Sequence, residues 1–164
     1  MRAERFDFPN ADGHLLTGLL ESPAGDPVAY ALFAHCFTCS KDSRAAKRMA
    51  EALAMRGIAL LRFDFTGLGS SEGDFANTDF SSNVDDLVAA ADHLRRTHQA
   101  PALLIGHSLG GAAVLAAAGR VPEAKAVATI AAPSDPGHIA DLLGDRIDGI
   151  RENGEGEVVL GGRA

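Results

Sequence analysis

An apolar run, a glycine-rich turn and a helix-favouring run follow one another between Pro101 and Ala118, and this stretch constrains the fold more than any other. Residues 102–105 are unbroken apolar sequence, which is typical of a parallel strand covered on both faces. Residues 112–118 are mostly alanine, and the run favours a helix. Between them stands Gly-His-Ser-Leu-Gly with Ser108 at its centre, and glycines two positions before and after a serine let strand and helix pass close together. The stretch therefore predicts a nucleophile elbow.

Strand and helix patterns alternate on both sides of this elbow. A strand-helix pair repeated three times and closed by a strand implies an α/β fold with a mostly parallel sheet. The expected elements are a strand at 28–34, a helix at 43–56, a strand at 58–63, a helix begun by Ser82 with Asp85 completing a capping box, the elbow, and a buried strand at 126–131. Ahead of them, residues 5–8 and 15–21 read as an antiparallel hairpin turned by Asp12-Gly13.

Composition narrows the class of ligand. The 164 residues are 46 % hydrophobic and carry a formal net charge of -7 with scattered basic residues, which argues against nucleic acid and anionic membranes as partners. No stretch approaches the roughly 20 apolar residues of a membrane span, and residues 1–10 lack the apolar run of a signal peptide. We expect a cytoplasmic protein with a small-molecule ligand.

Polar residues follow the predicted strands where parallel sheets gather their ligands, outside the carboxyl ends. They are His35, Cys36 and Phe37 after one strand, Asp64 after the next, Ser108 after the third, and Ser134 and Asp135 after the last. A serine nucleophile needs two N–H donors for the oxyanion that its attack creates. The backbone N–H of Leu109 is one candidate, and that of Phe37 is the best candidate for the second.

Two neighbouring residues invite other interpretations. His107 stands next to the serine, but adjacent side chains in a tight turn point apart, so we interpret it as a structural residue and not as the general base. Asp64 precedes Gly67, Gly69 and Gly73, whose spacing is one residue too long for a dinucleotide-binding loop. We expect Asp64 to anchor its turn through backbone hydrogen bonds. His14, His93 and His98 are expected at the surface.

The two cysteines form a C-x-x-C sequence, Cys36 to Cys39, which raises a redox hypothesis. The next helix begins only near Ser43, so no helix N-terminus lowers a thiol pKa there. A zinc site would need more ligands than Cys36, Cys39 and His35 supply. We expect no metal and no cofactor.

Taken together, Gly-His-Ser-Leu-Gly-Gly, the His35-Cys36-Phe37 loop and the segment from Arg62 to Gly73 resemble the α/β-hydrolases. The run from His35 to Asp42 is most similar to the hydrolase domain that bacteria fuse to an OsmC-type domain, in the serine aminopeptidase and esterase-like group. The resemblance implies Ser108 as nucleophile and Phe37 and Leu109 as oxyanion donors, with His35 and Asp64 in supporting loops. Most relatives have glycine after the loop histidine, where this chain has Cys36.

Relatives also carry an acid and then a histidine on later strands, and this chain ends before them. We therefore expect residues 1–133 to be the N-terminal portion of an α/β-hydrolase core that lacks the C-terminal strands. Residues 134–164 are expected to begin a cap or lid, with a helix pattern from Ile139 to Ile150 and a strand at 157–160. A local acid and base, Asp135 and His138, is a weaker possibility than surface loop residues.

Three functional hypotheses follow. The first is a serine hydrolase of carboxylic esters or related acyl compounds, incomplete in this chain, whose missing segment or an OsmC-like domain would be its partner. The second is a catalytically silent module of the same fold that binds a small ligand. The third is a C-x-x-C redox protein.

Overall fold

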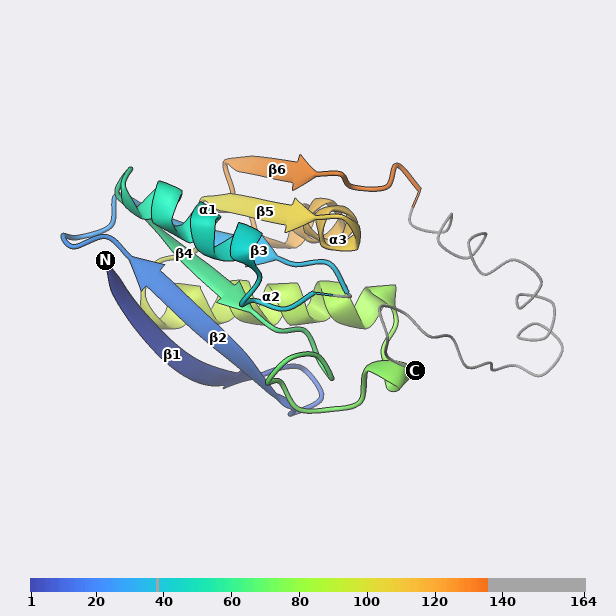
Figure 1. Ribbon diagram of the computed structural model, residues 1–164. Coiled ribbons are helices and arrows are strands. Elements are labelled where there is room, and N and C mark those ends of the chain that lie inside the picture. The colour runs from blue at the N-terminus through green and yellow to red at the C-terminus, as the bar shows by residue number, and fades with distance from the viewer. Residues whose placement is uncertain (38, 136–164) are drawn as a thin grey trace, which may run out of the picture. The chain divides into compact units, whose positions relative to one another are not determined.

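A six-stranded sheet forms the centre of the computed structural model, which describes residues 1–37 and 39–135 (Figure 1). Residues 1–132 form one compact unit, and residues from 133 onward belong to a second. The strand order is β1-β2-β4-β3-β5-β6. Their bounds are β1 (Arg2–Pro9), β2 (Leu15–Ser22), β3 (Ala29–Ala34), β4 (Ile58–Phe63), β5 (Leu103–His107) and β6 (Ala126–Ile130).

The predicted antiparallel hairpin is confirmed as β1 and β2, with Phe8 opposite Leu16. Its turn is closed by the side chain of Asn10, whose Oδ1 accepts the backbone N–H groups of Asp12 and His14, each at 3.0 Å. Strand β2 also runs antiparallel to β4, whereas β4, β3, β5 and β6 are parallel to one another. The predicted α/β class with a mostly parallel sheet is therefore correct.

Helices cover both faces of the sheet, which explains why the central strands are apolar without alternation. Helix α1 (Arg44–Ala54) packs on one face, and α2 (Phe80–Thr97) and α3 (Leu109–Ala117) on the other (Figure 1). Phe33 points to the α1 side while its neighbours Leu32 and Ala34 join the core on the opposite side. The described residues also include two short 3-10 helices, η1 (Phe75–Asn77) and η2 (Ala118–Arg120). Among the described helices, none combines the length and apolarity needed to cross a membrane.

The predicted N-cap of the second helix, Ser82, is wrong by three residues. Helix α2 begins at Phe80, and its N-cap is Asp79, whose carboxylate accepts the N–H of Ser82 at 2.7 Å. The Ser82 hydroxyl in turn accepts the N–H of Asp79 at 2.9 Å. The capping box therefore has the acid at the N-cap and the serine three residues later, at N3, the reverse of the predicted order. Asp85 pairs with Arg120 instead, at 2.5 Å.

Strand β6 occurs where it was predicted, but the expectation that it is buried is wrong. Four of its five residues are exposed, and the side chain of Ile130 is 44 % accessible. Its place at the end of the strand order explains this, because among the described residues only β5 pairs with it. Apolar composition alone does not distinguish an edge strand from a central one.

Candidate active site

Ser108 occupies the turn between β5 and α3 with φ 54° and ψ −126°. A positive φ at a non-glycine residue costs on the order of 1–3 kcal/mol and persists only where surrounding contacts enforce it. Here the Ser108 N–H donates to the Ile130 carbonyl at 2.8 Å, and the Ser108 carbonyl accepts the Gly111 N–H at 2.8 Å. The predicted strand, sharp turn and helix are confirmed.

The glycines around Ser108 permit backbone contacts that no side chain would allow. A Cβ on Gly106 would lie 2.3 Å from the Gly110 carbonyl oxygen, and one on Gly110 would lie 2.5 Å from the carbonyl oxygens of Ala34 and His35. The first turn of α3 therefore rests directly on the chain that leads out of β3. The N–H of Leu109, the first residue of α3, belongs to the helix turn that has no intrahelical acceptor.

The loop after β3 carries Phe37 and is held by its own contacts. The Phe37 ring is half-buried and meets the rings of Phe65 and Phe75 edge-on, with centroids 5.4 Å and 5.7 Å apart. Cys36 and Cys39 form a disulfide, and the Cys39 N–H donates to the Cys36 carbonyl at 2.9 Å. The sequence identified the C-x-x-C spacing but not the state of its sulfurs.

Asp64 is fully buried at the end of β4 and joins two loops. Its Oδ1 accepts the Lys41 N–H at 2.8 Å, and its Oδ2 accepts the Lys41 ammonium at 2.6 Å and the Ser70 N–H at 3.0 Å. Burial by itself would raise the pKa of Asp64, but His35 and these donors hold that pKa well below its ordinary value. The predicted anchoring of the turn through backbone hydrogen bonds is present, and the buried partner Lys41 is an addition that no motif indicated.

Arg62 extends this charged cluster beneath the loop. It is 1 % exposed, its Nε donates to Glu21 at 2.8 Å, and its guanidinium donates to the Lys41 carbonyl. Arg62 and Lys41 thus balance the buried carboxylates of Glu21 and Asp64. This network fixes the far end of the loop that begins at His35.

His35 supports the same loop from inside. It is 1 % exposed, and its Nδ1 lies 2.6 Å from the Cys36 carbonyl, which can only accept, so Nδ1 donates to it. Its Nε2 faces Asp64 Oδ1 at 3.5 Å, within the range of an ion pair, and makes no hydrogen bond within the described residues. Its ring also meets that of Phe65 edge-on at 5.2 Å.

A second buried carboxylate, Asp86 of α2, holds the turn that follows Asp64. It accepts the Thr66 N–H at 2.8 Å, the Thr66 hydroxyl at 3.0 Å and the Asn10 side-chain amide at 3.1 Å. Burial raises the pKa of Asp86, and these hydrogen bonds oppose part of that rise. Sequence reasoning did not single out this residue, because a lone acid within a helix pattern carries no signal of burial.

Within the part of the chain that the structure describes, no general base is brought to Ser108. Across residues 1–37 and 39–135, no histidine hydrogen-bonds to the Ser108 hydroxyl, and His107 is half-buried beside the disulfide. Asp135 is exposed and belongs to the second unit, and His138 lies outside the described residues. Of the other histidines, His14 is exposed as predicted, but His93 is half-buried and stacks on Phe6 with ring centroids 4.3 Å apart, so its assignment to the surface is wrong.

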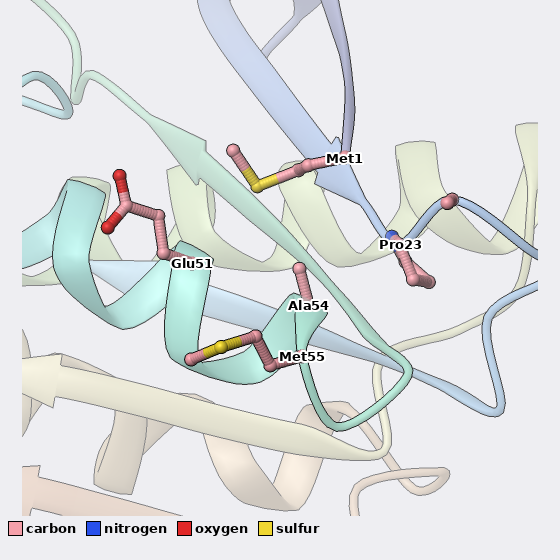
Figure 2. A pocket seen from close by; sticks show the side chains of 6 residues that line it. Met1, Pro23, Glu51, Ala54 and Met55 are labelled. Carbon is pink, nitrogen blue, oxygen red and sulfur yellow. The ribbon is translucent and has the colours of Figure 1, made fainter.

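A hollow of about 350 Å³ lies at the other end of the sheet and does not belong to this site (Figure 2). Met1, the loop after β2 and the end of α1 line it, with the side chains of Glu51, Ala54 and Met55 on the helix side. The parallel strands β3 and β4 begin near this end, whereas Ser108, Asp64 and Phe37 follow carboxyl ends of strands. The hollow therefore has no contact with the candidate chemistry.

Comparison with known proteins gives consistent matches. The family described as "Serine aminopeptidase, S33" matches residues 26–141. The chain is 30 % identical to human (Homo sapiens) monoglyceride lipase over 136 residues, which are 82 % of this chain and 40 % of the lipase. It is 38 % identical over 74 residues to the rat (Rattus norvegicus) mitochondrial palmitoyl-protein thioesterase ABHD10, covering 45 % of this chain and 24 % of that enzyme.

Among solved structures, the esterase domain of a Rhodothermus marinus protein is similar, with a TM-score of 0.71 and 53 % sequence identity. The match covers 85 % of this chain and 54 % of that domain. The chain thus spans about half the length of the esterase domain and two fifths of the human lipase.

Proposed function

The chain belongs to the serine aminopeptidase (S33) family of α/β-hydrolases, and from this premise we propose that it is an acyl hydrolase that cleaves carboxylic esters through Ser108. The observation that carries the proposal is the Ser108 turn. Its positive φ is enforced by hydrogen bonds and by glycines packed against backbone carbonyls. A strained serine at the start of a helix is how this fold presents a nucleophile.

In the proposed reaction, Ser108 Oγ attacks the ester carbonyl carbon while a base takes the hydroxyl proton. The carbonyl oxygen becomes an oxyanion, and the N–H groups of Leu109 and Phe37 would donate to it. Collapse of this intermediate expels the alcohol, which takes the proton, and leaves an acyl-enzyme on Ser108. Water then attacks the acyl carbon by the same steps in reverse and frees the acid and the serine.

The base and its orienting carboxylate are proposed to come from outside residues 1–135. A serine hydroxyl is a weak nucleophile until a positioned base accepts its proton, and the described histidines do not contact Ser108 Oγ. The Nδ1 of His35 is already hydrogen-bonded to the Cys36 carbonyl in the loop. Only His138 follows Ser108 in the sequence.

Carboxylic esters are the substrate class that the comparisons support best. The relatives are named as a lipase of monoglycerides, a palmitoyl-protein thioesterase and an esterase domain, and all three names denote acyl-group hydrolysis. A silent binding module remains the alternative, motivated by the absence of a base among the described residues. The names of the relatives do not favour it.

The test is hydrolysis of p-nitrophenyl acetate by the purified chain. We expect Ser108→Ala to remove the enzymatic rate, and Ser81→Ala, at an exposed serine of α2, to leave it unchanged. An oxyanion hole without a complete triad still retains about 10³-fold to 10⁴-fold acceleration over water, so the wild-type rate is expected at or below that level. A rate above that residual level that survives Ser108→Ala contradicts the proposal, and equal rates in the wild type and Ser108→Ala favour the silent module.

His138→Ala, measured beside these variants, locates the base. If the base lies outside the 164 residues, His138→Ala retains the wild-type rate. If His138→Ala loses as much as Ser108→Ala from a rate well above the residual level, the chain carries its own base. The expectation from the sequence that this chain is an incomplete hydrolase would then be wrong.

A further inference from the structure

Three metal-ligating side chains meet beside the elbow although the sequence placed only two of them together. The Sγ atoms of Cys36 and Cys39 and a ring nitrogen of His107 all lie within 4.8 Å of one another. Cys36 is buried, and Cys39 and His107 are half-buried. Ligation by thiolate and imidazole is the chemistry of zinc sites, and C-x-x-C is a common spacing for its thiolate pair.

The register of the sheet explains why His107 joins the cysteines. Strands β3 and β5 are parallel neighbours, and Ala34 pairs with Gly106. The chain beyond Ala34 therefore enters the C-x-x-C loop at the level where β5 ends with His107. Sequence reasoning considered His35 as the third ligand, but the structure turns that ring inward to Asp64 and brings His107 to the sulfurs.

The His107 ring has capacity for a ligand bond. The ring makes no hydrogen bond or ion pair within the described part of the chain. His107 is the last residue of β5, and this strand is paired with β3 on one side and β6 on the other. A ring positioned by rigid strands loses little freedom when it binds an ion. The cysteines are held as well, because the Cys39 N–H donates to the Cys36 carbonyl.

In the structure the sulfurs are joined to each other, and a disulfide offers no thiolate. A dithiol reductant would break the S–S bond, pass two electrons to it and become a disulfide itself, leaving both cysteines as thiols. Binding of a divalent ion then displaces one proton from each thiol. The two sulfurs can therefore either bond to each other or bind the ion, but they cannot do both.

From these observations we propose that the reduced chain binds one Zn²⁺ ion through Cys36 Sγ, Cys39 Sγ and His107, and that the Cys36–Cys39 disulfide excludes it. Zinc sites with three protein ligands and an open fourth tetrahedral position are known, so two cysteines and one histidine suffice where the sequence argument asked for more ligands. The proposal is independent of hydrolysis by Ser108, since its ligands and its test involve no ester.

Cobalt(II) is the probe, because tetrahedral Co²⁺ with thiolate ligands absorbs in the near ultraviolet and the visible. The chain is reduced with a phosphine, freed of it without oxygen, and titrated with Co²⁺ and then Zn²⁺. We expect thiolate-to-cobalt absorption that saturates at one ion per chain and disappears when Zn²⁺ is added. The untreated disulfide form, which needs no mutation, is expected to give no such absorption.

Matched variants identify the third ligand. Loss of groups that merely orient metal ligands costs about 10-fold to 100-fold in affinity, so His107→Ala is expected to weaken Co²⁺ binding at least 10-fold. His14→Ala, at an exposed histidine, serves as the control and is expected to bind like the wild type. Absence of the band in the reduced chain, binding unchanged by His107→Ala, or equal binding by the disulfide form would each overturn the proposal.

A redox measurement tests whether Zn²⁺ and the Cys36–Cys39 disulfide exclude each other. Free Zn²⁺ at 100 times its Kd should lower the equilibrium constant for disulfide formation about 100-fold, because the ion binds only the dithiol form. The shift is measured by thiol counting in buffers of set dithiol-to-disulfide ratio. If Zn²⁺ leaves the equilibrium constant for disulfide formation unchanged, the ion and the disulfide do not exclude each other, and the proposal is contradicted.

Discussion

Asp64 shows what one buried carboxylate does for the loops around the site. Its two oxygens collect the Lys41 ammonium and two backbone N–H groups from loops that are distant in sequence. Lys41 is itself only 4 % exposed, and its other acidic neighbour, Asp42, lies 3.4 Å away and is half exposed. Each buried charge therefore depends on the other. Removing one partner would leave the second without adequate compensation.

Asp64→Asn is expected to lower the free energy of unfolding at pH 7 by about 3–5 kcal/mol, as for other broken buried pairs. Because the folded-state pKa of Asp64 lies below its ordinary value of 3.8, its stabilisation is complete above that value and is lost as pH falls further. The difference between variant and wild type should therefore shrink below about pH 3.8. Urea unfolding across pH measures it.

Asp92→Asn is the control for this experiment, because Asp92 is partly exposed and pairs with Arg95 at the surface. Such pairs contribute about 0–1 kcal/mol. Equal losses in the two variants at pH 7 would contradict the anchoring role of Asp64.

At the scale of elements, the site depends on the close approach of α3 to β3 and β5. Gly106 and Gly110 lie where any Cβ would meet a backbone carbonyl, and neighbouring backbone cannot turn aside as a side chain can. The approach sets the first turn of α3, with Ser108 before it and Leu109 within it, against the loop of Phe37. The elbow is thus a property of two strands and a helix together.

Gly110→Ala is expected to destabilise the chain by about 1–3 kcal/mol, because the added methyl forces α3 away from the Ala34 and His35 carbonyls. Gly119→Ala, at the end of the same helical segment, has no atom within 4 Å of the new Cβ and should change stability by less than about 0.5 kcal/mol. Thermal unfolding compares them. A loss of stability in Gly119→Ala as large as that in Gly110→Ala would contradict close packing as the cause, because helix propensity by itself favours alanine over glycine.

At the scale of the whole molecule, the sequence predicted the sheet because its signals are local and repeated. Apolar runs, helix periods and the elbow glycines each mark an element where it stands, and the α/β class with its antiparallel hairpin followed from their order. It failed where the outcome depends on distant neighbours. Strand order and register determine three features that the sequence did not predict. These are the exposure of β6, the burial of Lys41 and the position of His107 beside two cysteines.

For the candidate site, the sequence placed Ser108, Leu109, Phe37 and Asp64 at carboxyl ends of strands, and the structure shows each beside those ends. Their catalytic roles stay predictions, as do the division at residue 133, the cytoplasmic location and an OsmC-type partner. The helix expected from Ile139 to Ile150 and the strand expected at 157–160 lie outside the described residues. A base cannot be assigned from a spacing, since triad members come from distant parts of a chain.

The central claim is that Ser108 is the nucleophile, and covalent labelling tests it most directly. A fluorophosphonate is offered to a longer chain that continues through later strands able to supply the base, and to its Ser108→Ala and Ser81→Ala variants. Each is verified as folded by circular dichroism, and the adduct is located by peptide mass spectrometry. We predict one adduct on the peptide that carries Ser108 in the wild type and Ser81→Ala, and none in Ser108→Ala. Labelling that persists in Ser108→Ala, or that falls on another residue, would contradict the account.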